Sequence, residues 1–280
     1  MGRRCARTAW AALLLVACSA CSTLPAPAQR LELARSIAAP AQLRLTRLPT
    51  TPPMVAAVSS APVSSDVLTV YIEGDGYAWR TPEWPSTDPT PLDPVALRLA
   101  ARHGHGAVAW LARPCQYVDA QAMACPTSYW TSQRYGLPST TLIDQALNDL
   151  KTRHGARHLV LVGYSGGGTV AASLASHRPD VIRLVTVAAN LDLGQWTAHH
   201  GLPALPADQN PALQGGRLRE IPQTHFVGAR DKVVPPDTVR SYAARIAVPS
   251  LVRVVDIPQA DHGCCWADLW PTLRTFALPG

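Results

Sequence analysis

Short apolar runs alternate along this chain with segments whose apolar residues recur every three or four positions. The runs have the length of buried strands and lie at residues 67–72, 107–111, 158–162, 181–189 and 251–257. The clearest helical segment is 139–154, where one face carries Leu142, Ile143, Ala146, Leu147 and Leu150. Strands that alternate with helices predict an α/β fold, with a mostly parallel central sheet and helices on both faces.

Other segments complete this arrangement. Residues 42–48 and 54–58 are typical of an antiparallel hairpin, with a Thr-Thr-Pro-Pro turn between its strands. Residues 79–91 contain too many prolines for a helix or a central strand, so we expect a loop there. Residues 190–214 are rich in Pro, His and Gly and leave room for a small cap. Further helices are expected at 93–104, 169–177 and 267–276.

The composition favours a single large domain. With 280 residues, of which 47% are hydrophobic and 16% charged, the chain can bury a full core. The formal net charge is +6, but three of the positive charges, on Arg3, Arg4 and Arg7, lie in a segment that we expect to be removed. No basic run with interleaved aromatic residues occurs, so we expect no nucleic-acid partner. We also expect the protein to be a monomer.

The N-terminus has the pattern of an export signal. A charged start precedes the apolar run 10–17, which is too short to span a bilayer, so we predict a lipoprotein-type signal peptide at residues 1–17. The run ends in Leu-Val-Ala-Cys, which resembles the lipobox of bacterial lipoproteins and implies lipidation of Cys18. Cys21 is the competing site, and an ordinary signal peptide with incidental cysteines is the alternative.

This interpretation implies a location and a domain division. Residues 18–30 would be a tether and residues 31–280 the folded domain. The lipid would hold the domain at the membrane of the cell envelope, in the periplasm or at the outer surface.

The strand at 158–162 leads into Gly-Tyr-Ser-Gly-Gly and then into an alanine-rich helix. A serine on so tight a turn is lifted clear of the sheet, and the glycines on both sides let strand and helix approach. Ser165 is therefore a candidate nucleophile. A competing interpretation is a dinucleotide-binding turn, because residues 166–171 also fit G-x-G-x-x-A and Asp192 lies where a ribose-binding acid would be. A P-loop is excluded because no lysine follows the glycines.

This strand, turn and helix resemble the nucleophile elbow of the α/β-hydrolases, and two later loops extend the resemblance. Residues 228–235 read Gly-Ala-Arg-Asp-Lys-Val-Val-Pro, which looks like the loop that carries the acid of the family's triad. His262 follows the last strand, where the family places its base. The resemblance implies a triad of Ser165, Asp231 and His262. Asp192 is the alternative acid, because it also follows a strand and some members of the fold carry the acid there.

The same resemblance points to an oxyanion hole. The strand at 67–72 leads into Glu-Gly-Asp-Gly-Tyr, and a glycine-containing loop at this place supplies one oxyanion donor in α/β-hydrolases, often within a His-Gly motif. Here Glu73 stands where that histidine would be. The resemblance implies that the backbone N–H groups of Asp75 and Gly166 stabilise the oxyanion. The alternative is that the glycines and the aspartate of this segment only form a tight turn.

These residues imply a reaction. A serine hydroxyl needs a base that takes its proton and returns it to the leaving group, and histidine can do both. We therefore expect a serine hydrolase, most simply a carboxylic ester hydrolase that forms an acyl-enzyme with a small-molecule acyl substrate. No cofactor is expected, and nothing has metal-ligand spacing. Peptidases, thioesterases and acyltransferases share the scaffold, and a non-catalytic envelope lipoprotein that uses it as a binding module is the alternative.

Two pairs of cysteines lie within the expected domain. Cys115 and Cys125 bracket a loop, and in an exported protein a disulfide between them is the natural interpretation, with two buried thiols as the alternative. The adjacent Cys264 and Cys265 follow the candidate base, and the sequence leaves open whether they form a vicinal disulfide or remain thiols.

Overall fold

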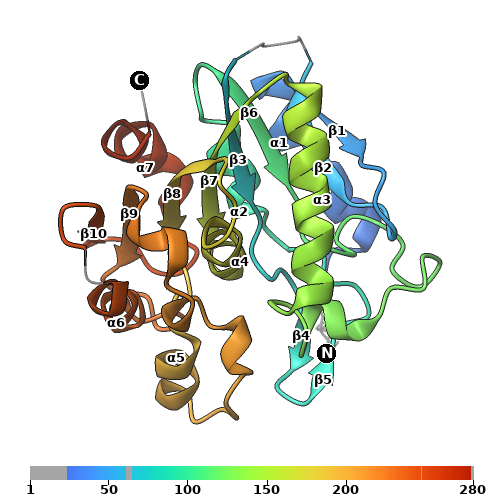
Figure 1. The fold of residues 1–280 in the computed structure, drawn as a ribbon. Helices are drawn as coiled ribbons and strands as arrows, with labels where there is room; N and C mark the ends of the chain where they lie inside the picture. The colour runs from blue at the N-terminus through green and yellow to red at the C-terminus, as the bar shows by residue number, and fades with distance from the viewer. Residues whose placement is uncertain (1–23, 61–64, 247, 279–280) are drawn as a thin grey trace, which may run out of the picture.

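A central sheet organises the molecule (Figure 1). A computed structural model describes residues 24–60, 65–246 and 248–278, so the predicted signal peptide, Cys18 and Cys21 lie outside the described residues. Eight described strands form the sheet in the order β1-β2-β6-β3-β7-β8-β9-β10. Their bounds are β1 (Leu43–Arg47), β2 (Val55–Ser59), β3 (Val67–Ile72), β6 (Ala107–Leu111), β7 (His158–Tyr164), β8 (Val181–Val187), β9 (Gln223–Gly228) and β10 (Val252–Ile257).

The strand directions confirm the mostly parallel sheet. The six strands from β6 to β10 in this order pair in parallel, and β1 and β2 add an antiparallel edge. The edge is the predicted hairpin, with Leu43 opposite Ser59 and Arg47 opposite Val55.

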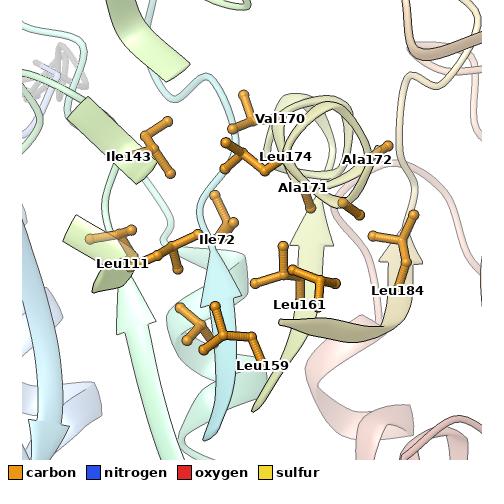
Figure 2. Packing of buried hydrophobic residues seen from close by; sticks show 14 of the residues in the cluster. Ile72, Leu111, Ile143, Leu159, Leu161, Val170, Ala171, Ala172, Leu174 and Leu184 are labelled. Carbon is orange, nitrogen blue, oxygen red and sulfur yellow. The ribbon is translucent and has the colours of Figure 1, made fainter. Parts of the chain in front are cut away.

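Strand β7 shows why the central strands are continuous apolar runs. Leu159 and Leu161 point into one hydrophobic cluster, while Val160 and Val162 point into a second cluster on the opposite face. Figure 2 shows Leu159 and Leu161 beside Ile72 of the neighbouring strand and below the helix that carries Val170 and Ala171. A strand that is buried on both faces favours apolar side chains along its whole length. Strand β9 is an exception, because its buried residues include Gln223, Thr224 and His225.

Helices cover both faces of the sheet, as the sequence predicted. One cluster contains the buried side chains of α3 (Leu137–Arg153), α4 (Gly166–Ala175) and α6 (Pro236–Ile246). The other contains those of α1 (Pro27–Ala38), α2 (Val95–Ala100) and α7 (Trp266–Leu273). Helix α3 begins two residues before the predicted start, because Pro138 is tolerated in the first turn, where the N–H groups need no helical partner.

Helix α1 occupies part of the stretch that we predicted as a tether. Residues 27–30 form its first turn, with Pro27 at the first helical position. Ala34 and Ala38 are fully buried, and the buried Arg30 donates a 2.5 Å hydrogen bond to the carbonyl oxygen of Thr90. Residues 24–29 are exposed, so the helix is held from Arg30 onward, by residues at the end of the predicted tether and beyond it.

The two irregular regions contain more structure than the sequence indicated. The proline-rich segment 79–91 contains a small hairpin of β4 (Trp79–Thr81) and β5 (Trp84–Pro85). The predicted cap region contains α5 (Leu193–His199), followed by the short 3₁₀ helices η3 (Ala207–Gln209), η4 (Pro211–Leu213) and η5 (Gly216–Arg219). Two further 3₁₀ turns lie at η1 (Ala39–Ala41) and η2 (Thr127–Trp130), and η6 (Arg274–Phe276) follows α7.

The structure joins both cysteine pairs. Cys115 and Cys125 form the predicted disulfide, with Cα atoms 6.1 Å apart. Cys264 and Cys265, which the sequence left open, are also joined. Within the described part of the chain, no helix has both the length and the apolar character that crossing a membrane requires.

Candidate active site

Ser165 occupies the turn between β7 and α4. Its φ of 50° and ψ of −126° are a conformation that L residues rarely adopt. The neighbouring positions have space only for glycine. A Cβ on Gly163 would lie 2.4 Å from the Cα of Gly168, and a Cβ on Gly167 would lie 2.3 Å from the carbonyl oxygen of Ile72. The glycines therefore let β7, α4 and the end of β3 meet closely around the serine.

The structure brings together the three side chains that the sequence singled out. His262 Nε2 lies 3.0 Å from Ser165 Oγ, and His262 Nδ1 lies 2.8 Å from Asp231 Oδ2. A carboxylate only accepts hydrogen bonds, so Nδ1 carries the proton of the neutral ring and Nε2 is free to accept from the serine hydroxyl. The side chain of Asp231 is fully buried and that of His262 is 21% exposed, so the base remains open to a substrate.

The second oxygen of Asp231 fixes the carboxylate. Oδ1 accepts hydrogen bonds of 2.8 Å from the backbone N–H groups of Val233 and Val234. These bonds depend on the tight turn after β9 that the Gly-Ala-Arg-Asp-Lys-Val-Val-Pro segment forms. The turn thereby directs Oδ2 toward His262.

The loop that carries His262 is held by two aromatic residues that sequence reasoning missed. The backbone oxygen of His262 accepts a 2.9 Å hydrogen bond from the Tyr164 hydroxyl and a 3.0 Å bond from Trp266 Nε1. Tyr164 is the residue before the nucleophile, so one tyrosine links the serine's turn to the histidine's loop. Its place in the pentapeptide was the only available signal.

Asp192 lies away from His262 and caps α5. Its Oδ1 accepts from the Gln195 N–H and from Asn210 Nδ2, and its Oδ2 accepts from Ser241 Oγ and Arg245 Nε. Burial raises the pKa of this carboxyl, but these hydrogen bonds and the Arg245 charge outweigh it, and the pKa lies below its ordinary value. Asp192 therefore anchors the cap region to α6, and its oxygens are already occupied.

The predicted oxyanion loop lies against the nucleophile. A Cβ on Gly74 would lie 3.4 Å from the Cβ of Ser165. Among the described residues, no acceptor pairs with the backbone N–H of Asp75 or with that of Gly166, the first residue of α4. Two such donors beside a nucleophile are available to a developing oxyanion.

Glu73, at the place where the α/β-hydrolases often carry histidine, points into the protein instead. Its carboxylate accepts hydrogen bonds from the Gly74, Ala96 and Leu97 N–H groups and from Trp110 Nε1, at 3.0 to 3.3 Å. Burial raises the pKa of Glu73 to about 7, although all four donors favour the charged form. This buried side chain fastens the loop to α2 and β6.

The raised pKa of Glu73 predicts that the unfolding free energy of the protein depends on pH. A carboxyl whose pKa rises from 4.5 to about 7 on folding stabilises the protein below pH 4.5, and that contribution is lost as the pH rises through about 7. We expect the unfolding free energy of the wild type, relative to Glu73→Gln, to fall by about 3 kcal/mol over this range. Urea unfolding at several pH values measures it. Glu83→Gln, on an exposed side chain, is the control, and a difference that does not vary with pH would contradict the assignment.

A cavity of about 470 Å³ opens at Ser165 and His262. Its apolar wall includes Trp79 of the small hairpin, Leu92, Trp196 of α5 and Val233 of the loop that carries Asp231. Trp196 Nε1 donates a 2.7 Å hydrogen bond to the Val233 carbonyl oxygen, which ties the cap region to the loop of Asp231. The apolar wall and the reacting groups therefore share one cavity.

A larger cavity of about 840 Å³ lies beside α1, and its lining includes none of Ser165, Asp231 and His262. Across the described ranges, no group of three or more His, Cys, Asp or Glu side chains is placed to hold a metal ion.

Comparisons with solved structures agree with this architecture. A puromycin hydrolase superposes with a TM-score of 0.59 at 15% identity, over 82% of this chain but only 37% of its own. The acylaminoacyl peptidase of Pyrococcus horikoshii gives a TM-score of 0.59 at 9% identity, over 84% of this chain and 41% of its own. An esterase domain from Rhodothermus marinus gives 0.54 at 14% identity, over 84% of this chain and 97% of its own.

No protein-family profile and no curated protein sequence matches the chain. At these low identities the structural matches establish the fold, and the chain has the α/β-hydrolase fold.

Proposed function

On the premise of an α/β-hydrolase fold, we propose that this protein is a serine hydrolase that cleaves carboxylic esters. The observation that carries the proposal is the continuous chain of hydrogen-bond contacts from Asp231 through His262 to Ser165. Asp231 is fully buried, as a carboxylate that orients and stabilises the imidazole should be. His262 is partly exposed, so it can exchange a proton with a substrate.

The geometry supports a two-step reaction. His262 Nε2 takes the proton of Ser165 Oγ as the oxygen attacks the ester carbonyl, and Asp231 stabilises the imidazolium. The Asp75 and Gly166 N–H groups would hold the carbonyl oxygen as it becomes negative. His262 then gives the proton to the leaving alcohol, which leaves the acyl group on Ser165. Water deprotonated by the same imidazole attacks the acyl-enzyme and releases the acid.

An ester is the preferred substrate because the cavity at Ser165 is small and has an apolar wall of Trp79, Trp196 and Val233. The structural neighbours include esterases and peptidases, so amide hydrolysis remains a second candidate, along with thioester hydrolysis and acyl transfer. A binding module without catalysis is the competing class of function.

A fluorophosphonate probe tests the proposal. The wild type should be labelled covalently on Ser165, because the probe needs an activated serine and an oxyanion hole, whereas Ser165→Ala should not be labelled. Ser173→Ala, a serine of α4, is the matched control and should label like the wild type. A folded wild type that does not react would instead favour a binding module without catalysis. If the wild type reacts, its rates on a series of 4-nitrophenyl esters and on the matching anilides separate esterase from peptidase.

We also propose attachment to the cell envelope through a lipid on Cys18, a residue outside the described part of the chain. The support is the sequence, in which Leu-Val-Ala-Cys ends a short apolar run. The full chain, expressed in a bacterium, should partition into detergent with Cys18 as its modified N-terminus. Cys18→Ala should abolish this, and Cys21→Ala should not. An unmodified N-terminus beyond residue 21 would contradict the proposal.

A further inference from the structure

The side chain of Asp75 places a negative charge beside the oxyanion donors. A Cβ added to Gly166 would lie 2.0 Å from Asp75 Oδ1, so the carboxylate lies directly against the residue that offers the second oxyanion donor. Asp75 also supplies the first donor through its own backbone. In the proposed reaction negative charge develops on the substrate oxygen between these two N–H groups, and a bare carboxylate there would oppose it.

Two arginines converge on this carboxylate. Arg113 Nη1 donates to Asp75 Oδ1 at 3.0 Å, and Arg134 Nε lies 3.2 Å from Oδ2. Arg113 is 4% exposed, and it also donates to the carbonyl oxygen of Arg134. Neither arginine has a second carboxylate partner among the described residues. Two positive charges therefore face one negative charge, and this local group carries a net positive charge.

Tyr135 completes the cluster. Its hydroxyl donates a 2.5 Å hydrogen bond to Asp75 Oδ2, and its ring lies 4.8 Å from the Arg134 guanidinium and 5.7 Å from that of Arg113. Burial, and then the charge of Asp75, raise the pKa of Tyr135, so the hydroxyl keeps the proton that it donates. These groups hold both carboxylate oxygens, Oδ1 through Arg113 and Oδ2 through Arg134 and Tyr135.

We propose that Arg113 and Arg134 are positioning residues of the oxyanion hole, which hold the Asp75 carboxylate and cancel its charge so that the loop can stabilise an oxyanion. The inference rests on the proposed serine-hydrolase function. Neither arginine needs to touch the reacting atoms. Their effect reaches the transition state through Asp75, and it exists only while Asp75 is negatively charged.

The dependence on charge gives a test by rescue. Arg113→Met keeps an aliphatic side chain but leaves the Asp75 carboxylate with only one positively charged partner, Arg134. We expect kcat on 4-nitrophenyl acetate to fall at least ~10-fold, with KM within ~3-fold, because the opposing charge acts on the transition state. Adding Asp75→Asn removes that charge but keeps a side chain of the same shape. The double variant should then be at least ~5-fold faster than Arg113→Met alone.

A merely structural arginine would give the opposite pattern. If Arg113 acts only by holding the fold, the second substitution removes one more contact, and the double variant is as slow as Arg113→Met or slower; that result overturns the proposal. Arg178→Met is the matched control, because Arg178 is also buried, with 8% of its side chain exposed, and is paired with Asp144 and Asp180, none of which lines the cavity. It should lower stability without lowering the kcat of the folded protein.

Two measurements keep the outcome unambiguous. If Arg113→Met does not fold, as judged by circular dichroism, the same cycle is measured with Arg134→Met, whose side chain is more exposed at 12%. Fluorophosphonate labelling of the wild type is measured first. An unlabelled wild type refutes the proposed function, whereas a labelled wild type without rescue in the double variant refutes only the role of the arginines.

Discussion

Ser165→Ala and His262→Ala should each lower kcat on the best 4-nitrophenyl ester at least ~1,000-fold, because nucleophile and base act as a unit. The 3.0 Å contact between Ser165 Oγ and His262 Nε2 is the path of the proton, and either substitution removes it. The double variant should be little worse than the single ones, since the second loss removes nothing that still functions.

Both variants should remain folded. Neither side chain belongs to the hydrophobic clusters of the core, and alanine avoids adding any group beside the tightly packed glycines. Circular dichroism and thermal unfolding serve as controls. His177→Ala, on an exposed histidine just after α4, should keep wild-type turnover. Near wild-type turnover in Ser165→Ala would contradict the mechanism, whatever happens to the histidine variant.

The fold was predictable from the sequence because most of its signals are local. Central strands such as β7 are buried on both faces, as Val160 and Leu161 illustrate, so they appear as apolar runs in the sequence. Helix α3 has five apolar residues on one face, which is a strong periodic signal. The strand, turn and helix around Ser165 combine both signals with glycine, and this segment anchored the rest of the interpretation.

The misread segments are those whose structure depends on distant partners. The first turn of α1 contains Pro27, Ala28 and Gln29, which give no local helical preference over a tether. Its helix is stabilised by burial of Ala34 and Ala38 and by the bond from Arg30 to Thr90, a residue 60 positions away. The hairpin of β4 and β5 is similarly too short and too rich in proline to be predicted from its own residues.

The residues of the candidate site also fall into those that have a local sequence pattern and those that depend on distant contacts. Ser165, Asp231 and His262 lie on loops with recognisable local patterns, so the sequence could propose them together. Arg113, Arg134 and Tyr135 have no motif, and only the packing of the loops after β6 and before α3 brings them to Asp75. A lone arginine in a sequence is more often a solvated surface residue, so no signal could have separated these from the others.

Asp231→Asn should be the most informative single change. Asparagine can still accept from the Val233 and Val234 N–H groups through its oxygen, which leaves the amide nitrogen facing His262 Nδ1. An amide N–H there requires an unprotonated Nδ1, so the ring proton moves to Nε2, the atom that must accept from Ser165. We expect kcat to fall about 10,000-fold with little loss of stability.

Asp192→Asn provides the matched comparison, because it makes the same chemical change at the other aspartate that follows a strand. Its oxygens bind Gln195, Asn210, Ser241 and Arg245, and none of these contacts reaches His262. We expect kcat within ~3-fold of the wild type and a loss of about 1–3 kcal/mol in unfolding free energy, because the charged bond to Arg245 is lost. Steady-state kinetics and urea unfolding of both variants measure the contrast. If Asp192→Asn loses turnover and Asp231→Asn keeps it, the acid is Asp192, and the 2.8 Å contact of Asp231 with His262 has no catalytic role.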